Sequence, residues 1–395
     1  MAKILYTWEL GTGYGHIAHL FPIALEMSRR GIDAFFVVKD LARAGDTICK
    51  HGYPVVQAPV WLAKPVGMPP AVTFPDILFR AGYFSSSGLT ALLKAWQSIF
   101  SLIKPDLLVA DHSPTALLAA RGTPIPKIVV GNSFTIPPAE TPLPPLTSGI
   151  GNDELVSREE LAVARINQSL DNLKKPPIYN LQEIFKAKET FIFTIPELDH
   201  FGNLRQRCEY LGPATMSQSG IKPKWPQRHK KKIFVYLYPA FKGFKNVIKA
   251  LGKLNVCAIV HAPGISKLDK IRLQTDTLFI YEEIIEINTV LKESDAAICH
   301  SGAGTGAAFL LAGRPVLLLP VQLEQMAIAQ KIAGLGAGLM LMPDANKSDY
   351  KSAIKNILEN KIYTTNAKRL AQKYKRLSHV RGIEKIANLC ESLIV

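Results

Sequence analysis

The sequence is poor in cysteine and has no long apolar run. Its 395 residues include five scattered cysteines, Cys49, Cys208, Cys257, Cys299 and Cys390. This spacing is unlike that of a zinc site or a disulfide-stapled secreted domain, and it favours a reducing compartment. The most apolar stretch, Ala307–Val321, contains Arg314 and two prolines and falls short of the roughly 18 apolar residues of a membrane-spanning helix. The N-terminus also lacks a signal-peptide pattern. We therefore expect a cytoplasmic protein.

Basic residues are in excess, but they are not concentrated. Lysine and arginine outnumber aspartate and glutamate by 47 to 32, so the surface should attract anions. The one dense basic run, Lys222–Lys232, lies in a proline-containing stretch and is typical of a solvated linker. This distribution argues against nucleic acid as a partner. It leaves phosphorylated ligands, and peripheral contact with the anionic inner face of a membrane.

Short β-rich runs alternate with helical patterns along the chain, which predicts an α/β fold with parallel sheets covered by helices. The expected strands of the first half are Ile4–Leu10, Ala34–Val38, Val55–Ala58, Leu107–Ala110, Ile128–Val130 and Thr190–Phe193. Those of the second half are Ile233–Tyr238, Val256–Val260, Leu278–Tyr281, Ala296–Cys299, Val316–Leu319 and Leu339–Met342. The restarted pattern predicts two doubly wound, Rossmann-like domains.

The same pattern predicts the domain boundaries. We expect an N-terminal domain over residues 1–214, a polar linker over 215–232, and a C-terminal domain over 233–375. A final helix over 376–395 is expected to pack back on the first domain. Two long segments, Pro59–Tyr83 and Pro137–Ser157, show no helix or strand pattern, and loops of this length commonly form lids or binding walls.

The most specific motif follows the expected strand Ala296–Cys299. There the run His300-Ser301-Gly302-Ala303-Gly304-Thr305-Gly306 leads directly into an apolar helix. A glycine-rich turn at a helix N-terminus presents backbone amides that favour a phosphate, and His300 and Thr305 add side-chain donors. Alone, such a turn is equally consistent with a tight strand-to-helix connection.

A second turn strengthens the binding hypothesis. The run Pro320-Val321-Gln322-Leu323-Glu324-Gln325 also follows a buried strand and precedes a helix, at the same edge of the sheet. The carboxylate of Glu324 and the carboxamide of Gln325 offer acceptors and donors for adjacent sugar hydroxyls. Without the first turn, this pair would be an ordinary helix N-terminus.

Together the two turns resemble the donor signature of family 1 nucleotide-sugar glycosyltransferases and their GT-B-fold relatives. The matching residues are His300, Gly302, Gly304, Thr305, Gly313, Pro315, Pro320, Glu324 and Gln325. The resemblance implies two Rossmann-like domains facing across a cleft, with a UDP- or dTDP-sugar as co-substrate and with no cofactor or metal. It also implies that His300 and the amides of Gly304 and Thr305 hold the diphosphate, and that Glu324 and Gln325 bind the sugar.

Recognition of the nucleoside is less defined. Ala308 stands where plant-type members of the family carry a glutamate for the ribose, so the choice between uridine and thymidine stays open. The base is expected near Leu278–Glu283, where Tyr281 can stack on it.

The N-terminal domain contains a candidate catalytic pair. His16 lies where the first strand meets the following helix, and the helix dipole there keeps an imidazole neutral and suited to act as a general base. Asp111 ends another strand of the same sheet and can orient that imidazole. The resemblance implies the same pair. His19, one turn later, is expected on the helix surface.

Other interpretations fit these residues less well. Gly11, Gly13 and Gly15 are not spaced as a dinucleotide-binding fingerprint. Ser113 has no nucleophile-elbow context, which argues against a serine hydrolase. A buried histidine satisfied by the backbone is the structural alternative for His16.

The sequence therefore predicts an inverting, metal-independent hexosyltransferase in which His16 removes the proton of an acceptor hydroxyl as its oxygen attacks the anomeric carbon. The leaving nucleoside diphosphate is stabilised by His300 and the helix N-terminus after it. A nucleotide-sugar epimerase of the same fold and a catalytically silent binding subunit are the alternatives. An apolar small-molecule or lipid acceptor is predicted from the crowded side chains Trp61, Met68, Phe74, Phe79, Tyr83 and Phe84.

Overall fold

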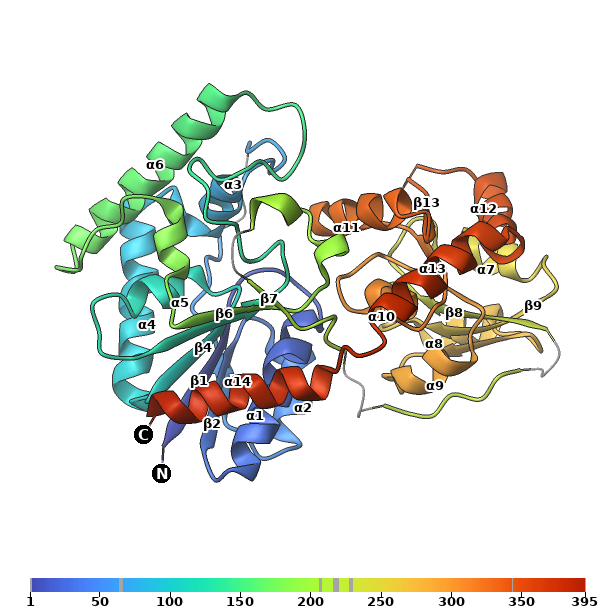
Figure 1. Cartoon of the computed structure of the whole chain (residues 1–395), viewed down its shortest axis with the longest axis horizontal. Coiled ribbons are helices and arrows are strands. Elements are labelled where there is room, and N and C mark those ends of the chain that lie inside the picture. Colours follow the sequence, from blue (N-terminus) through green and yellow to red (C-terminus); the bar gives the residue numbers. More distant parts are fainter. Residues whose placement is uncertain are drawn as a thin grey trace. The chain divides into compact units, whose positions relative to one another are not determined.

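The computed structural model describes residues 2–63, 67–205, 208–215, 220–226, 230–342 and 344–394. The chain divides into two compact units (Figure 1). Unit 1 comprises residues 1–193, 201–212 and 378–395, and unit 2 comprises residues 194–200 and 213–377. The expected boundaries at 214 and 376 lie close to these divisions. Residues 194–200, which we expected in the first domain, belong to unit 2.

Unit 1 is built on a parallel sheet of seven strands in the order β3-β2-β1-β4-β5-β6-β7. The strands are β1 (Lys3–Trp8), β2 (Asp33–Val38), β3 (Val55–Gln57), β4 (Leu107–Asp111), β5 (Lys127–Gly131), β6 (Glu189–Ile192) and β7 (Glu209–Tyr210). The order reverses between β1 and β4, where Trp8 pairs with Asp111. Ligands of doubly wound sheets bind at such a reversal, beyond the carboxyl ends of the strands. The two-residue edge strand β7 was not predicted.

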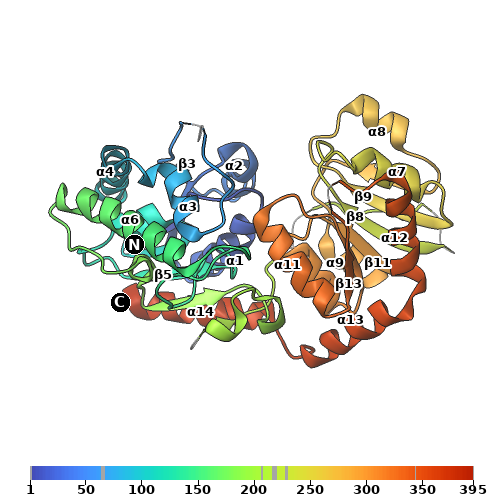
Figure 2. The ribbon, with the colours of Figure 1, turned by 90° about the horizontal axis from the view of Figure 1, so that it is seen from above.

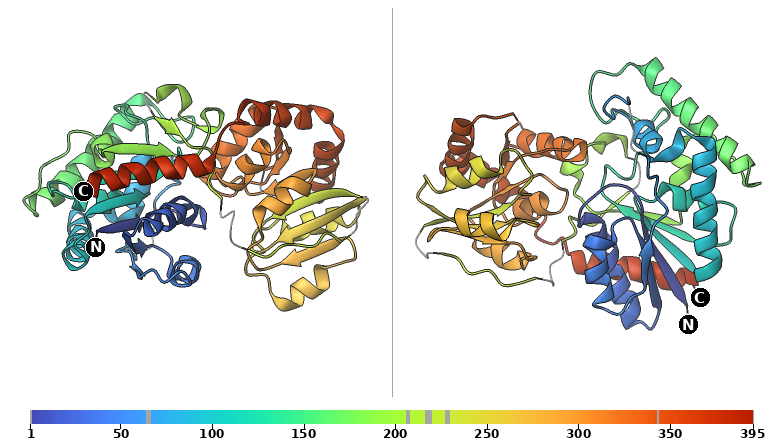
Figure 3. Two further views of the ribbon diagram at one scale, coloured as in Figure 1. Left: turned by 60° about the horizontal axis from the view of Figure 1, so that its bottom comes forward. Right: turned by 180° about the vertical axis from the view of Figure 1, so that it is seen from behind.

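Helices cover both faces of this sheet. They are α1 (Gly15–Arg29), α2 (Leu41–Cys49), α3 (Phe74–Leu78), a π-helical turn η1 (Phe79–Tyr83), α4 (Ser86–Ile103), α5 (Pro114–Ala119), α6 (Asn152–Asp171), the 3-10 turns η2 (Leu181–Phe185) and η4 (Gly202–Leu204), and α14 (His379–Ile394). The last helix, α14, packs along α1 (Figure 3), and Arg30 Nη1 lies 3.0 Å from Glu391 Oε2. The chain's final helix therefore completes unit 1.

The segment Pro59–Tyr83 is more ordered than the sequence predicted. The hydroxyl of Thr73 accepts from the N–H of Asp76, whose carboxylate accepts from the N–H of Thr73, and this capping box begins α3. The aromatic side chains of Phe74, Phe79 and Tyr83 are buried in the core of unit 1. The prediction of an unpatterned loop is therefore wrong for residues 74–83. Likewise, α6 begins at Asn152, inside the second expected loop.

Unit 2 is built on a parallel sheet of six strands in the order β10-β9-β8-β11-β12-β13. The strands are β8 (Lys231–Tyr236), β9 (Val256–His261), β10 (Leu278–Tyr281), β11 (Ala296–Cys299), β12 (Val316–Leu318) and β13 (Gly338–Met340). Figure 2 shows one face covered by α7 (Phe244–Leu251), α8 (Lys267–Leu273) and α12 (Lys347–Glu359). The other face carries α9 (Ile287–Glu293), α10 (Thr305–Leu311), α11 (Leu323–Gly334), α13 (Lys361–Lys373) and the 3-10 turn η3 (Pro196–Leu198).

Much of the expected linker belongs to unit 2. Residues 216–219 and 227–229 of this stretch lie outside the described residues. Of the rest, Ile221 donates its N–H to the Ile284 carbonyl at 2.8 Å and accepts from the Glu286 N–H at 2.9 Å. Lys231 and Lys232 already form the start of β8. Within the described parts of the chain, no helix is both long and apolar enough to cross a membrane.

Candidate active site

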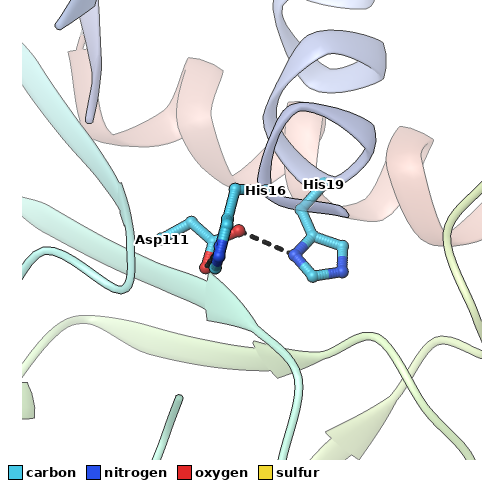
Figure 4. Close-up of side chains that lie close together, drawn as sticks. All are labelled: His16, His19 and Asp111. Carbon is cyan, nitrogen blue, oxygen red and sulfur yellow. Dashed lines mark hydrogen bonds and ion pairs between the residues drawn. The ribbon is translucent and has the colours of Figure 1, made fainter. Parts of the chain in front are cut away.

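His16, His19 and Asp111 meet at the carboxyl edge of the unit 1 sheet (Figure 4). Asp111 is the last residue of β4, and both histidines lie at the start of α1. The Nδ1 of His19 donates to Asp111 Oδ2 at 2.7 Å. The Nδ1 of His16 lies 3.1 Å from Oδ1 of the same carboxylate, without the alignment of a hydrogen bond. One carboxylate therefore faces two imidazoles.

The prediction that His19 lies on the helix surface is wrong. His16 and His19 are three residues apart, so they share the face of α1 that packs on the sheet. Only 4% of His19 is exposed, and its ring stacks on Phe193 with centroids 4.7 Å apart. Its best-aligned polar partner is Asp111, which comes from a strand 92 residues further along the chain.

Asp111 is ionised at neutral pH. Burial alone would raise the pKa of this carboxyl, but the neighbouring imidazoles of His16 and His19 outweigh burial and hold the pKa well below its ordinary value. An ionised carboxylate only accepts hydrogen bonds, so it favours histidine tautomers with the proton on Nδ1. That tautomer leaves a lone pair on Nε2 of His16.

The same three residues are also the one group, among the residues described, whose ligand atoms are close enough for a metal ion, all within 4.8 Å of one another. Their N–O separations of 2.7 and 3.1 Å are those of imidazole N–H groups facing carboxylate oxygens. A cation there would have to displace both Nδ1 protons.

A glycine-containing loop closes over His16. The indole of Trp8 stacks on the His16 ring at 4.9 Å. Gly11 has a φ of +80°, and a Cβ at that position would lie 2.6 Å from His16 Nε2. Lys39 Nζ donates to the Gly11 carbonyl at 2.9 Å and holds the loop in place. A side chain at position 11 would therefore crowd Nε2 of His16.

Two buried groups beside this cluster were not predicted. Glu9 accepts from the Trp96 indole N–H at 2.8 Å and from the backbone N–H of Thr115, yet burial raises the pKa of Glu9 to about 7. His112 has a φ of 45°, and burial lowers its pKa to about 3. Neither ring nitrogen of His112 has a hydrogen-bond partner among the residues described. The sequence did contain a signal for both residues, because Glu9 directly follows the last residue of β1, Trp8, and His112 directly follows the last residue of β4, Asp111.

The two turns predicted to bind the donor are adjacent in unit 2. β11 and β12 are neighbouring strands, and the Leu319 N–H donates to the Cys299 carbonyl at 2.9 Å. The Nδ1 of His300 donates to the Leu319 carbonyl, also at 2.9 Å. Residues 300–305 and 320–325 therefore lie together at the carboxyl edge of this sheet.

Both ring nitrogens of His300 bind the backbone. Besides the bond from Nδ1, its Nε2 accepts the N–H of Tyr238 at 3.1 Å, and the Tyr238 ring stacks on the imidazole. Burial lowers the pKa of His300. The predicted donation from this imidazole to a phosphate therefore requires a second proton on the ring and release of the Tyr238 N–H.

The glycines of the first turn have different surroundings. A Cβ at Gly304 would lie 2.7 Å from the Ala214 carbonyl, so only glycine allows this close approach of the two segments. At Gly302 a Cβ would meet nothing within 4 Å. Between β11 and Gly302, Ser301 takes a φ of 65° and is fully buried. Thr305 begins α10 after this turn.

The remaining predicted donor residues lie around the same edge. Glu324 and Gln325 lie in the first turn of α11, where Gln325 Oε1 accepts the Val321 N–H at 2.9 Å. Tyr281 ends β10, and its hydroxyl accepts from the Lys224 N–H at 3.2 Å. Sequence reasoning did not single out His261, the last residue of β9, whose pKa burial lowers to about 4. It stacks on Tyr236 at 4.9 Å.

Comparisons with known proteins show that the chain is similar to glycosyltransferases. Residues 245–389 match the family model "Erythromycin biosynthesis protein CIII-like, C-terminal domain". The "PGL/p-HBAD biosynthesis rhamnosyltransferase" of Mycobacterium bovis is 26% identical over 331 residues, which cover 78% of this chain and 72% of that protein. The "Uncharacterized UDP-glucosyltransferase YdhE" of Bacillus subtilis is 22% identical, over 91% of this chain and 92% of that one.

Solved structures agree on the fold. The spinosyn rhamnosyltransferase SpnG, in complex with thymidine diphosphate, superimposes with a TM-score of 0.66 over 100% of both chains at 16% identity. The chain is a GT-B-fold nucleotide-sugar glycosyltransferase. The two parallel sheets of the glycosyltransferase are the two Rossmann-like halves that its sequence predicted.

Proposed function

We propose that this glycosyltransferase inverts the anomeric centre of its donor sugar, with His16 as general base. The acceptor oxygen forms its bond to the anomeric carbon while its proton passes to His16 Nε2. The bond from the anomeric carbon to the diphosphate breaks, and its electron pair leaves with the nucleoside diphosphate. The observation that carries this assignment is the ionised Asp111 carboxylate, whose Oδ1 lies 3.1 Å from Nδ1 of the His16 imidazole.

His19 and Gly11 support the same assignment in different ways. The bond from His19 to Oδ2 restricts rotation of the carboxylate, whose Oδ1 faces His16. The absent side chain at Gly11 leaves Nε2 open to an acceptor hydroxyl. We assign His19 as a positioning residue, because it acts through Asp111 and not on the substrate.

In unit 2 we assign the diphosphate to the turn from His300 to Thr305. Its glycines let the phosphates approach the backbone amides of Gly304 and Thr305 at the start of α10. The charge of a bound diphosphate would favour a second proton on His300, which turns Nε2 into a donor. We assign the sugar hydroxyls to Glu324 and Gln325, and the nucleoside base to the surroundings of Tyr281. Thymidine and uridine diphosphate sugars are both candidate donors, because relatives are named for each.

The acceptor we propose is a small apolar molecule that carries a hydroxyl group. SpnG has been solved with the spinosyn aglycone, and the mycobacterial relative is named for PGL/p-HBAD biosynthesis. In this chain the partly exposed apolar side chains of Trp61 and Phe84 lie at the ends of the segment 61–84. Of the side chains from which an apolar acceptor was predicted, these two remain partly exposed to solvent, whereas Phe74, Phe79 and Tyr83 are buried in the core.

The test is turnover with a panel of thymidine and uridine diphosphate sugars and phenolic acceptors, with the product anomer read by NMR. We expect opposite anomeric configurations in donor and product. His16→Ala should lower transfer by on the order of 10²- to 10⁴-fold while nucleoside diphosphate still binds with wild-type affinity. A product of retained configuration, or wild-type turnover in His16→Ala, would refute the mechanism.

A further inference from the structure

Unit 2 carries an exposed surface on which cations and aliphatic side chains lie together. We call it the α7–α8 surface. Both helices cover the face of the sheet that they share with α12, whereas α10 and α11 of the donor turns cover the other face (Figure 2). The cations of the surface are Lys242, Lys245, Lys249, Lys253, Lys267, Lys270 and Arg272.

The lysines of α7 form a stripe. Lys245 and Lys249 are four residues apart, so they project from one side of the helix, and the exposed Lys253 follows in the turn after its end. The opposite side, with Phe244, Val247, Ile248 and Leu251, is buried in the core. The stripe therefore faces away from the sheet.

Cations predominate on this surface, next to the exposed Asp276 and to Glu283, which lies within electrostatic reach of Lys270. Residues 239–275 contain the seven cations named above and a single acidic residue, Asp269. Asp269 Oδ1 lies 3.8 Å from Lys245 Nζ, a long ion pair that ties α8 to α7. In the described part of the chain, no other ion pair engages these cations. Their field is therefore available to an external anionic partner.

Two aliphatic side chains project from the same surface. Leu268 is 66% exposed and Ile271 is 77% exposed. They are three residues apart and so share one side of α8, while Leu273 packs against the core. Projecting aliphatic groups surrounded by lysine and arginine are typical of a contact with the interface of an anionic bilayer. A polyanion such as nucleic acid would use the cations and leave Leu268 and Ile271 in water.

We propose that the α7–α8 surface docks the glycosyltransferase on an anionic phospholipid membrane. The lysine stripe faces the lipid headgroups, and Leu268 and Ile271 enter the boundary between headgroups and acyl chains. This surface belongs to unit 2. The aromatic segment from which the sequence predicted an apolar acceptor belongs to unit 1, where Phe74, Phe79 and Tyr83 lie in the core. The proposal does not depend on the catalytic assignment of His16.

The test is sedimentation of the full chain with vesicles of phosphatidylcholine, alone or mixed with phosphatidylglycerol. We expect binding to the mixed vesicles only, and release when salt is raised from about 0.1 M to about 0.5 M. K249E/K253E and L268S/I271S should each lower the vesicle partition coefficient at least tenfold. The matched control K361E/R369E changes the net charge by the same amount as K249E/K253E, at exposed residues of α13, which packs on the opposite face of the sheet. This control should bind as the wild type does.

The following results would count against the proposal that the α7–α8 surface docks on membranes. Wild-type protein that ignores the mixed vesicles would overturn it, as would a control variant that loses binding as much as K249E/K253E. Binding that survives both surface variants would place the membrane contact elsewhere. If duplex DNA binds as tightly as the vesicles and L268S/I271S leaves both unchanged, the surface recognises polyanions and not lipid. Unchanged circular dichroism melts and donor hydrolysis confirm that the variants are folded.

Discussion

The imidazole of His19 donates to Oδ2 of Asp111 at 2.7 Å, while the ring of His16 faces Oδ1 of the same carboxylate. Removing His19 leaves Asp111 free to rotate and weakens its hold on His16. We expect His19→Ala to lower kcat about tenfold while KM for the donor stays the same. His19→Asn, whose amide nitrogen can replace Nδ1 as the donor to Asp111, should recover most of the rate. Equal losses in both variants would mean that His19 matters only for packing.

Gly11→Ala should nearly abolish transfer, because its Cβ would lie 2.6 Å from Nε2 of His16. Gly13→Ala is the matched control. Gly13 also has a positive φ, of +92°, but a Cβ there would meet nothing within 4 Å. Both variants carry a backbone strain of about 1–2 kcal/mol, so the melting temperatures of both should fall. Only Gly11→Ala should lose turnover, and similar activities in the two variants would contradict an accessible Nε2.

Glu9 should make stability depend on pH. Its pKa rises from 4.5 to about 7 on folding, so between these values the folded state binds a proton that the unfolded state releases. The free energy of unfolding should therefore fall as the pH rises from about 4.5 to about 7, by up to about 3 kcal/mol. Urea unfolding at pH 5 and pH 7.5 measures the change. In Glu9→Gln this part of the pH dependence should vanish. If the free energy of unfolding of Glu9→Gln changes with pH as much as that of the wild type, Glu9 is not the source of the effect.

The two donor turns should respond differently to substitution. His300→Ala should weaken both free nucleoside diphosphate and intact donor, and slow the chemical step, because leaving-group charge grows in the transition state. Glu324→Ala should weaken only the intact donor, because it is assigned to the sugar. Calorimetric titration of each variant with both ligands gives four affinities. Unchanged nucleotide affinity in His300→Ala would make the glycine turn purely structural.

Chelation should leave transfer unchanged. The Nδ1 atoms of His16 and His19 lie 3.1 and 2.7 Å from the Asp111 carboxylate oxygens, and the proposed chemistry needs the protons on both nitrogens. Turnover after dialysis against EDTA should equal that of untreated enzyme, and added Zn²⁺ should inhibit by competing for the same nitrogen and oxygen atoms. Loss of activity that Zn²⁺ or Mn²⁺ restores would instead establish a metal site at this cluster.

The sequence predicted the two sheets well, because each long strand is a compact apolar run that is followed by a turn or a helix start. Prediction from the sequence failed for residues whose burial and hydrogen bonds depend on tertiary contacts. His19 follows Ile17 and Ala18 in an apolar helix pattern, so a polar ring there reads as exposed. Nothing local indicates that Asp111, 92 residues away, accepts a hydrogen bond from its Nδ1.

The prediction of a loop over Pro59–Tyr83, the segment before α4, failed for a different reason. Its proline and aromatic content hid a capping box between Thr73 and Asp76 that the sequence does contain, since Thr-Phe-Pro-Asp is a helix-start pattern. The two-residue strand β7 is too short to show any periodicity. At the donor edge, the motif located His300 correctly beside residues 320–325. It could not show that the backbone N–H of Tyr238, two residues after the end of β8, already donates to Nε2.

The packing of α14 on α1 gives the chain an order of assembly. Residues 378–395 belong to unit 1, yet the ribosome makes them only after all of unit 2. Until then the residues of unit 1 that pack against Ile383, Ile386, Ala387 and Cys390 stay exposed to solvent. The core of unit 1 is therefore still incomplete at a time when unit 2 can already form its own core. A nascent chain of this glycosyltransferase should therefore become resistant to protease in its second half before its first.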